Sequence, residues 1–175
     1  AGDIVRGGKQ DRVLTFDLMI SPNSGRVPLA AFCVERSRWN QRGGESAVQF
    51  SASTNCLPSK SLKIATRRAR SQGEVWKSVA KSQNVLGTKL NASVEAKASP
   101  TSLLLTLDNK ELQKSAGPYK KALLDIIKGK KDVIGFAYAL NGKINNVDLY
   151  ACHALFVKLW PKLLQAAVTE ALMEK

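Results

Sequence analysis

Alternation of apolar and polar side chains near the start of the chain is the feature that most constrains its fold. In residues 12–20 every second side chain is large and apolar: Leu14, Phe16, Leu18 and Ile20. A period of two predicts a β-strand with one apolar face. Residues 27–35 show a similar pattern, and the Ser-Pro-Asn-Ser-Gly sequence at 21–25 favours a turn between them. We therefore expect a β-hairpin.

The same pattern predicts the register of this hairpin. If Ile20 lies opposite Val27, apolar residues face apolar residues along both strands, and Arg12 lies opposite Glu35. We therefore predict that Arg12 and Glu35 meet as an ion pair at the open end of the hairpin. A pair between Glu35 and Arg38 is the alternative.

Helices are expected in the central part of the chain. Residues 47–52 are a further candidate strand, and the pattern becomes helical beyond Pro58. Ser71 and Glu74 have the spacing of a capping box, and the helix that follows is expected to stop at Gly87. Residues 112–127 are expected to be mostly helical with an interruption at Gly117-Pro118, because proline cannot sit inside a helical turn without losing a hydrogen bond.

Asn141-Gly142 is a strong hairpin signal, because these residues readily adopt the two positive φ angles of a two-residue turn. The turn joins residues 132–140 to residues 143–151, and its register places Tyr138 opposite Asn145. An amphipathic helix over residues 153–174 follows. The chain thus predicts an α+β fold: an N-terminal antiparallel hairpin or sheet, central helices, and a C-terminal β-hairpin followed by a long helix.

Length and composition bound the domain organisation. With 175 residues and 44% hydrophobic content, residues 1–175 are expected to form a single α+β domain around one core. The chain opens almost directly on a glycine-bearing motif with no element before it to pair the first strand, so we expect an N-terminal segment of the full-length protein to be lacking. No run of 18 apolar residues occurs, so no membrane span is expected. We expect a soluble protein, cytoplasmic or exported after removal of a leader.

Histidine and cysteine content excludes several classes of enzyme. His153 is the only histidine, so neither a Ser-His-Asp triad nor a histidine-rich metal site can be assembled. The three cysteines are too scattered for a disulfide framework or a structural zinc site. The sequence therefore indicates no metal, identifies no cofactor and leaves enzymatic activity open.

Positive charge is concentrated in the middle of the chain. The formal net charge is +13, and residues 51–100 hold nine Lys and Arg against two acidic residues. This segment includes Lys60, Lys63, Arg67, Arg68 and Arg70. These side chains could form an anion-attracting stripe or simply a solvated helix face. Nucleic-acid binding is not favoured, because no aromatic residues interleave these charges and no nucleic-acid-binding module is recognisable.

Three short motifs mark a candidate site, because each combines polar, charged and aromatic residues. They are Gly-Gly-Lys-Gln-Asp-Arg at 7–12, Cys-Val-Glu-Arg-Ser-Arg-Trp at 33–39 and Ser-Gln-Gly-Glu-Val-Trp at 71–76. The two glycines allow either close approach of the backbone to a ligand or a bulge that leads into a strand. We predict that the three motifs converge on one surface.

Each candidate residue has a chemical role in this hypothesis. The candidate ligand-binding residues are Lys9, Gln10, Arg12, Arg38, Trp39, Gln72 and Trp76, and Glu35 is the candidate catalytic residue. Lys9 and Arg12 would attract an anion, and the two glutamines would orient it by hydrogen bonds. Glu35 would act as an acid or base or hold a ribose hydroxyl, and either tryptophan could stack on a ring.

The motifs resemble a known family. The three motifs above, the Asn-Gly hairpin with Val-Asp-Leu-Tyr at 147–150, and Leu-Trp-Pro-Lys-Leu-Leu at 159–164 occur in this order. They resemble the ADP-ribosylglycohydrolase- and rhodanese-phosphatase-associated protein domain, over nearly all of the chain. Members of this family look longer at the N-terminus. The resemblance implies a link to ADP-ribose or NAD metabolism, and it supplies neither a reaction nor catalytic residues.

Three hypotheses about function follow. The first is a site for an anionic small ligand, nucleotide-like or ADP-ribose-like. The second is a structural or interaction module without catalysis, in which the motif residues lock the hairpin to the following helix. The third is a basic binder of nucleic acid or anionic surfaces. Burial of Arg12, Glu35 and Trp39 without an adjacent cavity would favour the structural module, whereas a shared pocket with unsatisfied donors would favour the ligand site.

Overall fold

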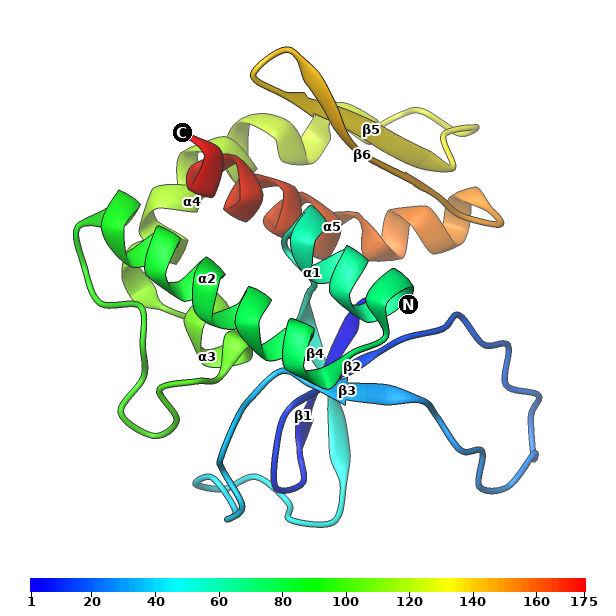
Figure 1. Cartoon of the computed structure of the whole chain (residues 1–175). Coiled ribbons are helices and arrows are strands. Elements are labelled where there is room, and N and C mark those ends of the chain that lie inside the picture. Colours follow the sequence, from blue (N-terminus) through cyan, green and yellow to red (C-terminus); the bar gives the residue numbers. More distant parts are fainter.

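An antiparallel sheet of four strands forms the N-terminal part of the computed structural model, which describes residues 1–175 (Figure 1). The strands are β1 (Asp3–Gly7), β2 (Arg12–Leu14), β3 (Ala31–Cys33) and β4 (Phe50–Cys56). Their order in the sheet is β3-β2-β1-β4. The two inner strands are therefore β2 and β1, and the candidate motif at residues 7–12 forms the turn between them.

Helices and a separate hairpin follow the sheet, which confirms the α+β class. The helices are α1 (Lys60–Ile64), continued by the π-helical turn η1 (Ala65–Ala69), α2 (Gln72–Leu90), α3 (Leu103–Leu107), α4 (Lys110–Leu123) with the 3-10 turn η2 (Leu124–Ile127), and α5 (His153–Glu174). The hairpin consists of β5 (Gly135–Leu140) and β6 (Lys143–Leu149). None of the helices is long and apolar enough to cross a membrane.

Side-chain caps set where several helices begin. The hydroxyl of Ser71 accepts a hydrogen bond from the Glu74 amide, as the capping-box spacing predicts. Glu74 pairs with Lys77 instead of reaching back to Ser71. Helix α2 runs three residues past the predicted stop and ends at Leu90, and its C-cap Asn91 has a left-handed φ of 49°.

The predicted interruption at Gly117-Pro118 is wrong, because α4 continues through Pro118. Leu112 and Ala116 are buried on this helix, and their packing against the core favours an unbroken helix despite the amide that proline lacks.

The first hairpin differs from its prediction in length and in register. Strand pairing places Arg12 opposite Cys33 and Leu14 opposite Ala31, two residues away from the predicted register. Arg12 therefore does not lie opposite Glu35. One more backbone hydrogen bond follows, from the Thr15 amide to the Ala30 carbonyl, and the ladder then ends close to Pro28, which has no amide to donate.

Residues 16–29 form an extended arm that is not part of the sheet (Figure 1). The apolar residues predicted for the core face, Phe16, Leu18 and Ile20, are each more than half exposed. The core receives the opposite face of β2, on which Val13 is completely buried. The face that we predicted to enter the core is therefore wrong, both in β2 and in the arm that follows it.

The second hairpin contains the predicted turn. Asn141 and Gly142 have φ angles of 50° and 78°, and Leu140 lies opposite Lys143. An irregularity between Tyr138 and Ala139 then shifts the pairing by one residue, so that Tyr138 faces Asn146 instead of Asn145. Such a bulge explains why a register counted from the turn fails farther along the strands.

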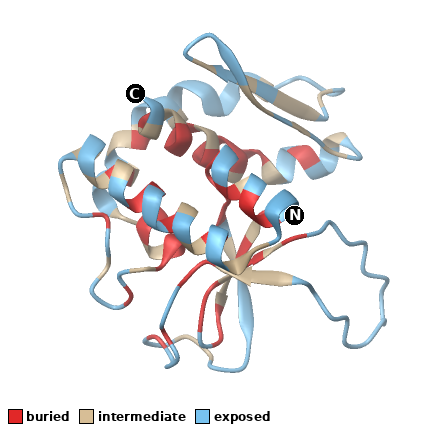
Figure 2. Ribbon diagram, viewed as in Figure 1, coloured by how far each residue is buried: buried red, intermediate tan, exposed pale blue.

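The core lies between the helices and the inner face of the sheet. It contains 23 buried apolar residues, and Figure 2 shows buried segments of α2, α3 and α5 turned toward one another. Aromatic packing joins the second hairpin to α5, since Phe136 makes an edge-on contact with Trp160 at 5.4 Å between ring centroids. The Trp160 indole donates a 2.8 Å hydrogen bond to the Leu124 carbonyl.

Gly7 and Gly8 allow the β1–β2 turn to approach β4 closely. Gly7 has a φ of 121°, and a Cβ atom there would overlap the Gln49 carbonyl oxygen. A Cβ atom on Gly8 would lie 2.7 Å from the Phe50 ring. These two glycines therefore have a packing role in the turn beside β4, and neither forms a β-bulge.

We predict that Gly7→Ala lowers the free energy of unfolding by about 1–3 kcal/mol, because it combines overpacking with an unfavourable φ angle. Gly117→Ala is the matched control, since nothing lies within 4 Å of a Cβ atom at that helical position. The control should raise stability by about 0.5–1 kcal/mol. Urea unfolding of both variants measures the difference, and equal stability of the two would contradict this explanation of Gly7.

Candidate functional site

Hydrogen bonds bring the three motifs together around the end of β3. The Asp11 amide donates to the Glu35 carboxylate at 2.8 Å, which joins the first motif to the second. The Gln72 side chain accepts from the Cys33 amide at 2.8 Å and donates to the Cys33 carbonyl at 2.7 Å. The Trp76 indole donates to the Glu35 carbonyl at 3.2 Å. The first turn of α2 is thus attached to β3 much as a neighbouring strand would be.

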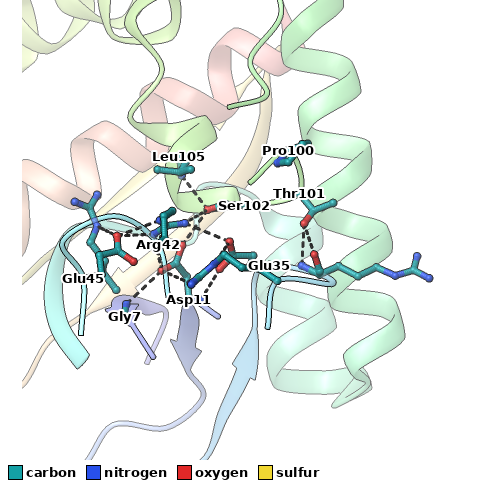
Figure 3. Close-up of polar contacts among 12 residues, drawn as sticks. Gly7, Asp11, Glu35, Arg42, Glu45, Pro100, Thr101, Ser102 and Leu105 are labelled. Atoms are coloured by element: carbon teal, nitrogen blue, oxygen red, sulfur yellow. Dashed lines mark hydrogen bonds and ion pairs between the residues drawn. The ribbon is translucent and has the colours of Figure 1, made fainter. Parts of the chain in front are cut away.

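A buried ion network lies at this junction (Figure 3). We use this name for Asp11, Glu35, Arg42 and Glu45, which Figure 3 labels, together with Arg38. Asp11 and Glu35 are completely buried, and both arginines are about nine-tenths buried. Charges removed from water to this extent are stable only when their hydrogen-bonding capacity is largely satisfied by partners.

Arginine side chains satisfy both buried carboxylates. Arg38 Nε donates to Glu35 Oε1 at 2.6 Å, and Arg42 Nη1 lies 3.3 Å from the same oxygen. Arg42 Nη2 contacts both oxygens of Asp11 at 3.0 Å. The Arg42 guanidinium therefore bridges the two carboxylates and holds the loop after β3 against the β1–β2 turn.

Helix α3 adds a further contact to the network. The Ser102 hydroxyl donates to Asp11 Oδ2 at 2.9 Å, and the same oxygen atom of Ser102 caps α3 by accepting from the Leu105 amide (Figure 3). Asp11, Arg42 and Ser102 were not among the predicted site residues. Asp11 lay inside a motif that had been noticed, whereas no local pattern marks Arg42 or Ser102, which are 31 and 91 residues away from Asp11.

The two carboxylates differ in their expected ionisation. Burial acts to raise the pKa of Glu35, but hydrogen bonds from Arg38 and from the Asp11 amide outweigh it and hold that pKa below its ordinary value. Burial raises the pKa of Asp11, and the negative charge of Glu35 raises it further despite the opposing effect of Arg42. Glu35 is therefore the firmly ionised member of the pair.

The predicted pair between Arg12 and Glu35 is wrong, and the alternative pair with Arg38 is present. Arg12 lies opposite Cys33, and its guanidinium is 5.9 Å from the centre of the Phe50 ring. The two-residue change in register moves Glu35 past the end of β3. There it meets the loop that carries Arg38 and Arg42 instead of the start of β2.

The other predicted residues divide into two groups. Gln72 and Trp76 are used in contacts within the protein, and the guanidinium of Arg36 lies 5.6 Å from the centre of the Trp76 ring. Lys9 and Trp39 are exposed, Trp39 by 68%. Of these four residues, only Lys9 and Trp39 are free to contact a ligand without rearrangement.

Two donors among the predicted residues are buried without a hydrogen-bond partner. They are Nε2 of Gln10 and Nη2 of Arg38, and both side chains are at least nine-tenths buried. Arg38 Nη1 lies 3.4 Å from the Gly8 carbonyl oxygen, so the Arg38 side chain contacts the same turn that carries Gln10.

The fold and the buried ion network together define an α+β domain in which three separate motifs share one polar junction. The family model of the ARG and Rhodanese-Phosphatase-superfamily-associated Protein domain matches residues 1–175. The chain belongs to this family, which confirms the resemblance seen in its motifs. No curated protein and no solved structure matches the chain.

We predict that Glu35→Gln lowers the free energy of unfolding at pH 7 by about 3 kcal/mol, because it leaves two buried guanidinium groups short of a charged acceptor. A carboxylate with a lowered folded-state pKa stabilises the fold above its unfolded pKa of about 4.3 and loses this contribution as the pH falls through the folded-state pKa. The difference between wild type and Glu35→Gln should therefore shrink as the pH falls from 7 to 3.

Urea unfolding at several pH values measures this difference. Glu74→Gln is the control, because it neutralises an exposed carboxylate that pairs with Lys77 on the surface of α2. The control should change stability little at any pH. A destabilisation of Glu35→Gln that stays constant down to pH 3 would show that charge is not what Glu35 contributes.

Proposed function

We propose that this domain binds a small anionic ligand beside the β1–β2 turn, with Gln10 and Arg38 as the donors. The supporting observation is that both side chains carry a buried donor without a partner. Buried polar groups in folded proteins are nearly always hydrogen-bonded, so two such donors on contacting segments call for an acceptor. A phosphate or carboxylate oxygen is the acceptor that a guanidinium binds best.

Exposed residues on the same segments would extend this contact. Lys9 follows Gly8 in the turn and would add positive charge for attraction of the ligand. Trp39 follows Arg38 and presents its ring to solvent, where a nucleobase could stack on it. A nucleotide-like ligand of the ADP-ribose class has both a phosphate group and a ring, so it fits this pair of residues.

Glu35 acts as a positioning residue in this proposal. Its carboxylate is completely buried and bonded to Arg38 Nε, so it fixes the Arg38 guanidinium. Nη1 of that guanidinium donates to the Asn40 carbonyl, whereas Nη2 has no hydrogen-bond partner and lies 3.9 Å from Asp11 Oδ1. Such burial does not suit an acid or base that must touch a substrate. Gln72 and Trp76 act through the backbone of β3, and Arg12 lies to one side over Phe50.

The structural module is the second candidate, and a specific observation favours it. Both buried carboxylates are fully partnered, and none of the three main cavities adjoins them. In that case the network only locks the turn, β3 and α2 together, and bound water satisfies the two donors. Binding measurements separate this candidate from the ligand site.

We predict that inorganic phosphate, AMP or ADP-ribose raises the melting temperature of the wild-type protein, because a ligand that binds only the folded state stabilises it by mass action. Gln10→Met keeps the side-chain volume and removes the free donor. It should weaken binding by about tenfold or more, the typical effect of one hydrogen bond to a charged group. Without ligand, the same variant should be as stable as wild type, since it removes a donor that has no partner.

Gln165→Met is the matched control, because Gln165 is equally buried but belongs to α5, away from the motifs. It should leave the ligand-induced shift unchanged. Absence of a shift with all three compounds at saturating concentrations would refute the ligand site, and so would an unchanged shift in Gln10→Met. Either result would leave the structural module as the function that the geometry supports.

A further inference from the structure

A second feature of the molecule, separate from the buried ion network, is a large apolar cavity. It measures about 590 Å³ and lies between the arm, the β5–β6 hairpin and α5. Twenty of its 26 lining residues are hydrophobic, among them Phe16 and Leu18 of the arm, Leu149 of β6 and Leu159 of α5. Figure 1 shows the arm and the start of α5 on the same side of the molecule. This volume lies within the range of small-molecule sites.

The apolar lining of this cavity is poorly covered by the protein itself. Phe16, Leu18 and Ile20 are each more than half exposed, and Leu149 is exposed by 72%. Exposed apolar side chains scattered over a surface are ordinary, but a contiguous group around a cavity usually marks a binding site. The hydrophobic effect therefore favours an occupant that is itself apolar along most of its length.

Positive charge remains at one end of the cavity after internal ion pairs are formed. Among the lining carboxylates, Asp3 pairs with Lys162 at 2.8 Å and Asp148 pairs with Lys63 at 2.9 Å. Asp17 pairs with the N-terminal ammonium group, and its side chain is 89% exposed, so water also screens its charge. Arg67 lines the cavity and has no ion-pair partner.

Arg67 also lines an adjacent cavity of about 500 Å³, which shares Ala1, Phe16, Asp17 and Ala30 with the first. Arg70 lines this second cavity, and its guanidinium lies 5.5 Å from the centre of the Phe16 ring. Arg67, in η1, thus lies where the two cavities meet, and Arg70, the C-cap of η1, lies beside it in the second cavity. Both arginines are exposed. Their charge is suited to a single anionic group.

We propose that these cavities bind an amphipathic anion, a single hydrocarbon chain with a carboxylate or phosphate head. The chain occupies the apolar cavity between the arm and α5. The head lies at Arg67 and Arg70. A nucleotide does not fit the first cavity, because its lining offers few free donors. A second copy of this chain is disfavoured as the occupant, because both copies carry a formal net charge of +13 and repel each other.

Isothermal titration calorimetry with dodecanoate below its micellar concentration tests this proposal on the wild-type chain. We expect saturable binding of one dodecanoate per chain. Arg67→Gln should weaken dodecanoate binding at least tenfold, because it removes the unpaired charge at the junction of the cavities. Arg68→Gln is the matched control. It removes the same charge from the neighbouring residue, which lines neither cavity, and should change affinity less than twofold.

Two further measurements distinguish the contribution of the ligand's anionic head from that of its hydrocarbon chain. Dodecan-1-ol, which lacks the charge, should bind wild type and Arg67→Gln equally well, and Leu18→Ser should weaken binding of both compounds. Dodecyl phosphate in place of dodecanoate shows which anionic head the arginines prefer, and tighter binding of either one supports the proposal.

Three outcomes would overturn the proposal. One is the absence of saturable binding of dodecanoate or dodecyl phosphate. Another is an equal loss of affinity in Arg67→Gln and Arg68→Gln, which would reveal only general attraction to a basic protein. The last is a dimer in sedimentation velocity that Leu18→Ser dissociates, which would assign the apolar face to a second copy.

Discussion

The carboxylate of Glu35 is the point on which the arrangement of the N-terminal half depends. It accepts hydrogen bonds from the Asp11 amide and from Arg38 and Arg42, and the carbonyl of the same residue accepts from Trp76. One residue thereby connects the β1–β2 turn, the loop after β3 and the first turns of α2. Because an unpaired buried carboxylate is strongly unfavourable, these segments are held in the single arrangement that completes its set of donors. The buried carboxylate of Asp11 likewise needs donors, and one of them is the hydroxyl of Ser102 at the start of α3.

This network also explains the register of the first hairpin. The predicted register was counted from the turn, where Ile20 was expected to lie opposite Val27. In the structure the strands are joined through the long arm, and a connection of this length cannot fix a register by its own geometry. The register is set at the other end, where the Val34 amide donates to the Asp11 carbonyl and Gln72 bonds both backbone groups of Cys33. A shift of two residues preserves which side chains share a face, so periodicity could not reveal it.

Signals that act over a few residues were predictable from sequence, whereas partners distant in sequence were not. The Ser71 cap and the Asn141-Gly142 turn depend on local conformational preferences, and both are present. The convergence of the three motifs was predictable because their residue types are unusual for a core. The partners of Glu35 were predictable only in part: Arg38 lies three residues away, but Arg42 is recognisable only once the loop has folded back onto Asp11. The face of β2 that enters the core depends on which elements pack against it, and the alternating pattern alone does not determine this.

The arm is the part of the chain in which the wrongly predicted face has a consequence for function. Its alternating residues were expected to fill the core of a hairpin, but the core is already completed by Val13 and the helices, so Phe16, Leu18 and Ile20 remain at the surface. A strand-like sequence without a strand partner keeps its apolar side chains available for another occupant. The two ends of β2 therefore differ in kind. At Arg12 the strand adjoins a polar junction whose two buried carboxylates are partnered within the protein, whereas beyond Leu14 it leads to an apolar cavity bordered by unpaired positive charge. The first end holds the segments of the fold together, and the second leaves apolar side chains exposed beside a cavity.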